Sequence, residues 1–251
     1  MSDITFDFTG KAFAVVGATS GIGAQVLKEL LEAHAHVLAV GRNEERLAKL
    51  ERMGAVARAF DVSQATTEEW KDLLDPFVAT QGRLDGVVYT AGIALQTPLQ
   101  YFDTAAAKRA MDTNFWGALT CLQAASKKRQ SKDGASYVLF SSVAGRTGAR
   151  GDAVYAASKA ALRIASASFA QDIARRRQRI NTISPAWIET PMVERSPISD
   201  PAKKAHAAEQ YLLGLGTPRD VAGMVLFLLS DRAQWITGTD ILVDGGFLHS
   251  R

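Results

Sequence analysis

Short apolar runs alternate with longer, helix-length segments along this chain. The runs are rich in β-branched and aromatic residues, which is typical of buried strands. Strands separated by segments of that length need crossover connections, and crossovers join parallel strands. The pattern predicts seven strands, at residues 13–16, 36–40, 55–60, 86–91, 136–141, 179–184 and 241–243.

The central runs predict strands that are covered on both faces. Residues 86–89 and 137–140 show little polar alternation, as expected between two layers of helices. No repeat and no linker rich in Pro, Gly or Ser interrupts the pattern. The sequence therefore predicts one α/β domain over residues 1–251, with a Rossmann-type, doubly wound, mainly parallel seven-stranded sheet and helices on both faces.

One segment, residues 190–216, breaks this rhythm. It is long for a connection in a compact domain, and it contains Pro191, Pro197 and Pro201. Connections of this kind are usually lids or binding loops, so we expect it to overhang the C-terminal edge of the sheet and shape a substrate pocket. The other side chains expected around that pocket are Leu95, Arg146, Arg150 and Trp187.

Composition narrows the function classes. The 251 residues are 47% hydrophobic, enough for a sizeable buried core. No uncharged apolar run reaches the ~18 residues of a membrane span, and the acidic start lacks a secretory signal. The single cysteine, Cys121, cannot form an internal disulfide. These features predict a cytoplasmic protein that does not enter a membrane.

Charge argues against nucleic acid and metal. The net charge of +3 is small for this length, so no nucleic-acid partner is expected. The four histidines have no partners at ligand spacing, so no metal site is expected. One basic cluster is interpreted first as a solvated helix C-terminus. It comprises Arg175, Arg176, Arg177 and Arg179.

A glycine-rich turn follows the first predicted strand. Gly17, Gly21 and Gly23 stand between that strand and a helix. Glycines there permit a tight turn and a close approach of the backbone to a pyrophosphate, which then lies at the helix N-terminus. In this strand–turn–helix setting, the triplet predicts a dinucleotide site rather than merely a tight loop.

The end of the second predicted strand favours NADP(H) over NAD(H). An NAD-selective fold places an acid about 20 residues after the glycines to hold the ribose 2′-hydroxyl. Gly41 stands there instead, and the guanidinium of Arg42 can bind a 2′-phosphate through forked hydrogen bonds. If Arg42 is only a surface residue, the cofactor stays open. Asp61 and Val62 are expected to flank the adenine, unless Asp61 caps the next helix.

Three further residues predict proton transfer. Tyr155 and Lys159 stand four residues apart in a helix-forming run and so share a face, although such a pair alone is usually an ordinary surface pair. The lysine charge is expected to lower the tyrosine pKa from about 10. Ser142 follows an apolar run and is placed at the C-terminal end of a strand, where open α/β sheets bind ligands.

These motifs and the chain length resemble the short-chain dehydrogenase/reductase family in its single-domain form. The glycine triplet matches the family's motif, with Val16 in place of a frequent threonine. The family's Asn-Ala-Gly after the fourth strand reads Thr90-Ala91-Gly92, which keeps the loop but replaces a bracing amide with a hydroxyl. The resemblance adds Thr19, Ser20, Ile22, Ala91, Gly92, Ile188 and Thr190 to the cofactor-binding residues.

The resemblance also implies a reaction, reversible hydride transfer between NADP(H) and a small-molecule carbonyl or alcohol. It makes Tyr155 the general acid/base, Ser142 the group that polarises the carbonyl, and Lys159 the ligand of the nicotinamide ribose. Asn114 matches the family's active-site asparagine, which holds a relay water; the alternative is a polar residue that bends a helix. Ser142 is preferred to Ser141 because it stands 13 residues before Tyr155.

Two other functions and an assembly are also considered. A 3-oxoacyl-[acyl-carrier-protein] reductase would dock its acidic carrier on the basic cluster and on Lys203 and Lys204. A catalytically idle NADP-binding regulator would not need the complete catalytic set. The resemblance places the family's last helix at residues 220–229, where apolar side chains cover much of the circumference. We expect it to be buried in a homotetramer or homodimer, unless it is a core helix.

Overall fold

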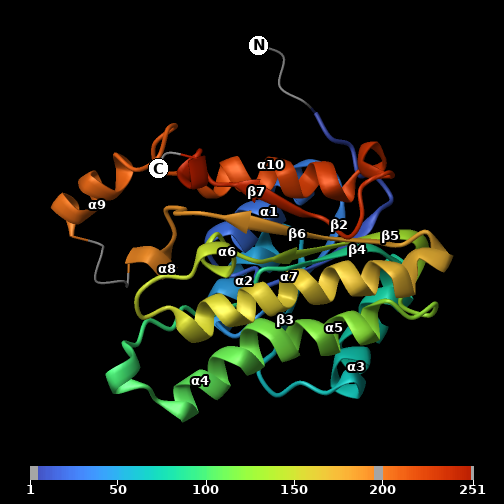
Figure 1. The fold of residues 1–251 in the computed structure, drawn as a ribbon. Helices are drawn as coiled ribbons and strands as arrows, with labels where there is room; N and C mark the ends of the chain where they lie inside the picture. The colour runs from blue at the N-terminus through green and yellow to red at the C-terminus, as the bar shows by residue number, and fades with distance from the viewer. Residues whose placement is uncertain (1–4, 195–199, 250–251) are drawn as a thin grey trace.

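The computed structural model describes residues 5–194 and 200–249, and its centre is a seven-stranded sheet (Figure 1). The strand order is β3-β2-β1-β4-β5-β6-β7, and each neighbouring pair is parallel. The strands are β1 (Ala12–Val16), β2 (His36–Gly41), β3 (Val56–Ala59), β4 (Leu84–Tyr89), β5 (Ser131–Phe140), β6 (Arg179–Pro185) and β7 (Asp240–Val243).

Helices connect the strands and cover both faces of the sheet. The α-helices are α1 (Gly21–Glu32), α2 (Glu44–Arg52), α3 (Thr67–Gln81), α4 (Thr104–Met111), α5 (Gly117–Ala125), α6 (Ala144–Thr147), α7 (Ala153–Ile173), α8 (Pro191–Glu194), α9 (Pro201–Ala208) and α10 (Pro218–Leu229). The other helical turns are η1 (Leu99–Tyr101), the π turn η2 (Asp112–Trp116), η3 (Ala174–Arg176), η4 (Asp231–Ala233) and η5 (Phe247–His249).

Local sequence explains where several helices begin. At α3, Thr66 and Glu69 form a capping box, and Thr217 and Asp220 do the same at α10. Asn43 accepts a hydrogen bond from a backbone N–H in the first turn of α2. These caps satisfy N–H groups that have no partner within the helix, so each helix starts at a defined residue after its strand.

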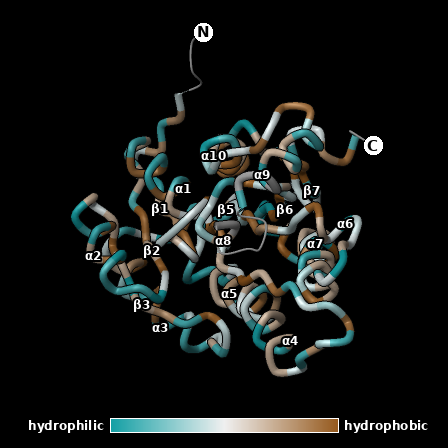
Figure 2. Tube along the Cα trace, turned by 90° about the vertical axis from the view of Figure 1, so that its left-hand side faces the viewer, coloured by the Kyte–Doolittle hydropathy of each residue, from teal (hydrophilic) through white to brown (hydrophobic). Residues whose placement is uncertain are grey.

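Two apolar cores lie on the two faces of the sheet. Alternate residues of β1 enter them: Phe13 and Val15 pack with α1, α2 and α10, whereas Ala12, Ala14 and Val16 pack with α3, α5 and α7. Figure 2, viewed toward the edge where α8 and α9 lie, shows the strands between these helix layers. The α/β fold class predicted from the sequence is therefore confirmed, and all seven predicted strands are present.

Two further expectations can be compared with the structure. The connection over residues 190–216 contains α8 and α9, although Pro197 lies outside the described residues. The apolar side chains of α10 are used within the chain, since Val221, Val225 and Leu229 are buried among α1 and sheet residues. The alternative, that α10 is a core helix of the single chain, thus explains its apolar sequence. A second subunit is not needed to bury these side chains. Within the described residues, no helix has the length and apolar character needed to cross a bilayer.

The strand order places a crevice between β1 and β4. From β1 the chain builds the sheet outward through β2 to β3, and it then returns to the other side of β1 to form β4. Val16, the last residue of β1, pairs with Val40 on one side and Tyr89 on the other. At such a switch point the two following connections diverge, which leaves room for a ligand at the carboxyl ends of the strands.

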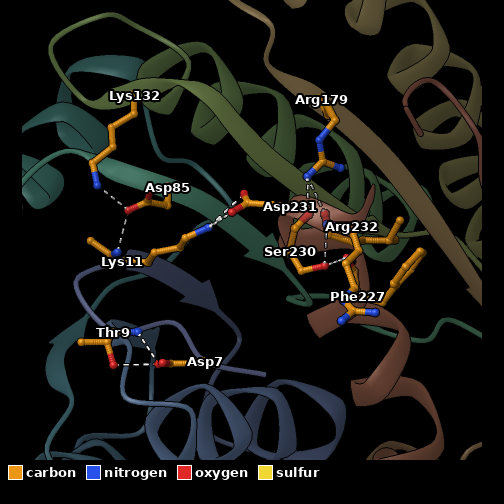
Figure 3. Close-up of polar contacts among 12 residues, drawn as sticks. Asp7, Thr9, Lys11, Asp85, Lys132, Arg179, Phe227, Ser230, Asp231 and Arg232 are labelled. Atoms are coloured by element: carbon orange, nitrogen blue, oxygen red, sulfur yellow. Dashed lines mark hydrogen bonds and ion pairs between the residues drawn. The ribbon is translucent and has the colours of Figure 1, made fainter. Parts of the chain in front are cut away.

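A polar network lies at the amino ends of the strands, opposite the crevice (Figure 3). Arg179 is only 6% exposed, and its guanidinium donates to the carbonyl oxygens of Leu228 at 2.8 Å and Ser230 at 3.3 Å. It therefore satisfies carbonyls at the end of α10. Nearby, Lys11 forms an ion pair with the exposed carboxylate of Asp231. The interpretation of Arg179 as part of a solvated cluster is wrong, because its strand is buried on both faces.

We predict that Arg179→Met lowers the free energy of unfolding by about 2–4 kcal/mol, because it removes buried, charge-assisted hydrogen bonds to the carbonyls of Leu228 and Ser230. Lys11→Met is the matched control and should cost less than about 1 kcal/mol, since it removes a largely exposed ion pair. Urea denaturation at one fixed protein concentration measures both. Equal losses would contradict this account of the amino-end network.

Candidate active site

A pocket of about 290 Å³ lies at the carboxyl ends of β1, β4 and β5. Every residue predicted to be catalytic or to bind the cofactor lines it except Asn114, which is buried directly behind Gly92. The predicted residues in the wall are Gly17, Thr19, Ser20, Gly21, Ile22, Gly23, Arg42, Asp61, Val62, Ala91, Gly92, Ser142, Tyr155, Lys159, Ile188 and Thr190.

The glycine turn forms one end of the pocket. Gly17 and Gly21 have positive φ values of 86° and 55°, a conformation that glycine adopts without strain. A Cβ atom at Gly23 would lie 2.3 Å from the carbonyl oxygen of Gly17 and 2.5 Å from Thr90 Oγ1. The turn therefore admits no side chain at this position. It leaves the N-terminus of α1 open to the pocket, where backbone N–H groups can bind an anion.

Thr90 braces the turn from β4. Its hydroxyl donates to the carbonyl oxygen of Val16 at 2.8 Å, in addition to the backbone bond between the same two residues. The hydroxyl thus links the ends of β1 and β4, the task that the resemblance assigned to an amide. A Cβ at Gly17 would lie 2.6 Å from Thr90 Oγ1. With Thr90 in this position, residue 17 therefore has no room for a side chain.

Basic side chains gather beyond the turn. Arg42 is exposed at the end of β2 and lines the pocket together with Asp61, whose pKa is lowered by hydrogen bonds from Ser63 and, less, by Arg42. Asp61 is not the cap of α3, because Thr66 has that role. Sequence reasoning missed Arg46, which donates from α2 to the carbonyl oxygen of Thr19 at 3.3 Å. Arg46 stands four residues after Arg42 in the first turn of a predicted helix, and this spacing could have indicated that both arginines lie near the pocket.

Ser142 follows β5 and begins the α6 turn. Its Oγ accepts a hydrogen bond from the backbone N–H of Ala144 at 3.2 Å, and its hydroxyl interacts with Tyr155. The neighbouring Ser141 instead donates to the carbonyl oxygen of Lys159 at 3.0 Å. The two serines therefore differ in use: Ser141 joins β5 to α7, whereas Ser142 faces the tyrosine.

Tyr155 and Lys159 share one face of α7, as their spacing predicts. Lys159 is 5% exposed, and its Nζ donates to the carbonyl oxygen of Phe140 at 2.8 Å. The same Nζ lies 5.7 Å from the centroid of the Tyr155 ring. The ammonium is thus held beside the phenol by the last residue of β5, at the edge where the pocket opens.

The predicted pKa shift of Tyr155 has the wrong sign. Burial raises the pKa of Tyr155, the hydrogen bond with Ser142 lowers it, and Asp152 raises it. Burial also lowers the pKa of Lys159 to about 8. Withdrawal from water disfavours the charged form of each group, and it is the largest cause of each pKa shift. The phenol therefore keeps its proton, while the lysine can lose one near neutral pH.

Asn114 occupies the π turn η2 between α4 and α5. Its side chain accepts from the N–H of Ile93 at 2.8 Å, and it donates to the carbonyl oxygen of Ile93 at 3.1 Å and to Ser158 Oγ at 3.0 Å. A π turn inserts an extra residue into a helix and re-aims side chains, and such turns are common at functional sites. Here it ties the loop after β4 to α7.

The expected substrate-pocket residues are placed differently. None of Leu95, Arg146, Arg150 and Trp187 lines the main pocket. Arg146 is paired with Asp240 instead. The 190–216 connection is closed at its base by a bridge between Ile188 and Gly216, and the side chains of Glu189 and Lys204 form an ion pair there. Ala186 has no positive φ, so the chain leaves β6 without backbone strain.

Comparisons with known proteins identify the family. A family model described as enoyl-(acyl carrier protein) reductase matches residues 17–248. Oxidoreductase asL5 of Sarocladium schorii is 32% identical, covering 95% of this chain and 96% of its own. The solved structure of a short-chain type dehydrogenase/reductase from Mycobacterium ulcerans gives a TM-score of 0.88 at 31% identity, covering 97% of this chain and 91% of that one. The chain belongs to the short-chain dehydrogenase/reductase family.

Another relative is the 3-oxoacyl-[acyl-carrier-protein] reductase FabG of Rickettsia conorii, 31% identical over 96% of this chain and 98% of its own. As an oxidoreductase of this family, the chain uses a nicotinamide cofactor. Its residues fit that group, because the turn at Gly17 and Gly23 is kept free of side chains beside a helix N-terminus. Within the part of the chain that the structure describes, no cluster of three or more His, Cys, Asp or Glu side chains forms a metal site.

We predict that Gly23→Ala abolishes nucleotide binding, because its methyl group would displace the carbonyl of Gly17 and the hydroxyl of Thr90. Gly223→Ala is the matched control, since a Cβ at this position in α10 meets no atom within 4 Å. It should leave binding unchanged and stabilise the helix by about 0.5–1 kcal/mol. Fluorescence titration with NADPH and NADH, with thermal unfolding alongside, measures both. Normal nucleotide binding by the Gly23 variant would contradict the assignment of the glycine turn as the nucleotide site.

Proposed function

We propose that this protein is an NADP(H)-dependent oxidoreductase of one domain that interconverts a small-molecule carbonyl and an alcohol, with Tyr155 as the general acid/base. One observation carries the proposal. A protonated phenol, the Ser142 hydroxyl and the Lys159 ammonium converge at the end of the pocket that begins at the glycine turn. A module that only binds nucleotide, such as an NADP-binding regulator, has no need of this arrangement.

A bound nicotinamide supplies the hydride. In reduction, Ser142 and Tyr155 donate hydrogen bonds to the substrate carbonyl oxygen and polarise it, and Tyr155 gives its proton to the oxygen as negative charge develops. Lys159, with its pKa near 8, returns a proton to the phenolate and binds the nicotinamide ribose. Asn114 holds the loop at Ile93 and, through a water, connects Lys159 to solvent. Oxidation of the alcohol reverses these steps.

The choice of NADP(H) rests on charge at the other end of the pocket. Arg42 lines the pocket, Arg46 donates to the carbonyl oxygen of Thr19, and Gly41 leaves no carboxylate to hold a 2′-hydroxyl. A Cβ at Gly41 would lie 2.6 Å from Cγ2 of Thr19, so an acidic side chain there would also disturb the turn. Both features favour a 2′-phosphate.

We predict that Tyr155→Phe removes nearly all turnover, a loss of at least about 100-fold, because it removes the phenol proton that the proposed mechanism gives to the substrate oxygen. NADPH binding should stay within about twofold, since the ring is retained. A panel of diacetyl, cyclohexanone, acetoacetyl-CoA and glyceraldehyde, followed by NADPH oxidation at 340 nm, finds the substrate and then compares the variant. Equal rates at saturating substrate would eliminate Tyr155 as the acid.

We predict that Arg42→Ala raises the KM for NADPH by about tenfold, the equivalent of one lost charge-assisted contact, and leaves the KM for NADH unchanged. Arg52→Ala, at the far end of α2, removes the same charge away from the pocket and should alter neither value. A wild type that prefers NADH would overturn the NADP assignment.

A second candidate is a 3-oxoacyl-[acyl-carrier-protein] reductase, which is what the relative from Rickettsia conorii is named. Several basic residues of the proposed docking cluster are not free to bind an acidic carrier. Arg179 is buried, Arg176 donates to Asp133 and to two backbone carbonyls, and Lys204 pairs with Glu189. Binding of acyl carrier protein that weakens with added salt separates this candidate from a small-molecule enzyme.

We also propose a cytoplasmic location and a homotetramer or homodimer. The single cysteine, Cys121, is buried and forms no internal disulfide. Trp116 and Ile164 are 54% and 62% exposed. These side chains, rather than α10, are the better candidates for a subunit contact.

A further inference from the structure

An ion pair joins the α6 turn to the edge strand of the sheet. Arg146 Nε donates to Asp240 Oδ2 at 2.8 Å, its Nη2 contacts the same oxygen, and Nη2 also donates to the backbone carbonyl of Asp240 at 3.1 Å. The two residues stand 94 positions apart in the sequence. Three contacts from one planar guanidinium fix its orientation as well as its position.

The carboxylate of Asp240 is itself held from β6. Its Oδ1 accepts from Thr182 Oγ1 at 2.6 Å and from Ser184 Oγ at 2.8 Å, and its side chain is only 7% exposed. Thr182 and Ser184 are two residues apart on a buried strand, so they point to the same face of the sheet. Asp240 is therefore a rigid anchor whose hydrogen-bonding capacity is filled.

The α6 turn connects this anchor to Ser142. With four residues, α6 is too short to be stable alone, and its N-cap residue, Val143, forms no side-chain hydrogen bond to it. The N–H of Ala144 in this turn donates to Ser142 Oγ, which leaves the hydroxyl proton free to point away from the turn. On its other side the turn packs closely against α7, since a Cβ at Gly145 would lie 2.8 Å from the backbone nitrogen of Ala160.

We propose that Arg146 and Asp240 are positioning residues: their ion pair holds the α6 turn in the place from which it orients the Ser142 hydroxyl toward Tyr155 and the substrate. This role rests on the proposed function, because it acts through Ser142. Neither residue touches the main pocket, so each affects the reaction only by fixing the turn.

The test is a double-mutant cycle with the full-length protein. We expect Arg146→Met to lower kcat at least about tenfold for the panel compound that the wild type reduces fastest, with the dissociation constant for NADPH within about twofold. In a Ser142→Ala background, the same substitution should change kcat by less than about twofold, because the group it positions is already gone. Arg146→Lys keeps the charge but loses the fork, so it should recover part of kcat.

A matched control separates positioning from general loss of stability. Arg176→Met removes a guanidinium that also binds a carboxylate and a backbone carbonyl, those of Asp133 at 2.8 Å and Ser131 at 2.7 Å, but at the amino end of the sheet. It should leave kcat unchanged. The proposal would be overturned if Arg146→Met lowered kcat by the same factor in the wild-type and Ser142→Ala backgrounds. It would also be overturned if Arg176→Met lowered kcat as much as Arg146→Met does.

Hydrogen exchange of the Ala144 amide is a readout that needs no substrate. We expect it to be faster in Arg146→Met and in Asp240→Asn than in the wild type, because the turn loosens. Exchange as slow as in the wild type overturns the proposal. If the wild type reduces no compound of the panel, the proposed function fails, and this measurement alone decides whether the ion pair holds the turn. If Arg146→Met does not fold, Arg146→Lys and Asp240→Asn decide it.

Discussion

The close approach of the β1–α1 turn to the end of β4 is the constraint on which the site depends. A Cβ at Gly17 would lie 2.7 Å from the backbone nitrogen of Ala91, and one at Gly23 would lie 2.5 Å from Thr90 Oγ1. Since the strand order reverses between β1 and β4, their connections diverge beyond this contact. The contact sets the depth of the crevice, and the polar groups of β5 and α7 are placed relative to it.

Main-chain atoms hold the polar side chains of the site. Lys159 is bonded to the carbonyl of Phe140, Asn114 to both polar groups of Ile93, and Ser142 to the N–H of Ala144. Phe140 ends a buried strand, and Ile93 and Ala144 lie in the connections that follow β4 and β5, so these bonds define the geometry of the side chains before any ligand enters. The Arg146–Asp240 pair extends the same principle, because it fixes the backbone that holds Ser142.

Sequence reasoning recovered what short-range pattern encodes. The strands follow from apolar periodicity, the glycine turn from three residues within one connection, and the shared face of Tyr155 and Lys159 from their spacing. It failed where partners are distant or burial decides. Arg146 was expected in the pocket, and the sequence did not reveal its ion pair because its partner, Asp240, lies 94 residues away. The pKa of Tyr155 was given the wrong sign because sequence shows the neighbouring charge but not the loss of water around it.

That loss of water has a consequence for the direction of proton transfer. A phenol whose pKa is raised is protonated at neutral pH, so in the proposed reaction it is available as an acid, while the lysine beside it, with a pKa of about 8, can exchange protons near that pH. A depressed phenol pKa would instead have favoured a base that receives a proton from an alcohol. The Ser142 hydrogen bond lowers the Tyr155 pKa and so opposes the effect of burial. In the proposed mechanism, burial therefore keeps the proton on Tyr155, and the Ser142 hydrogen bond limits how far the Tyr155 pKa rises.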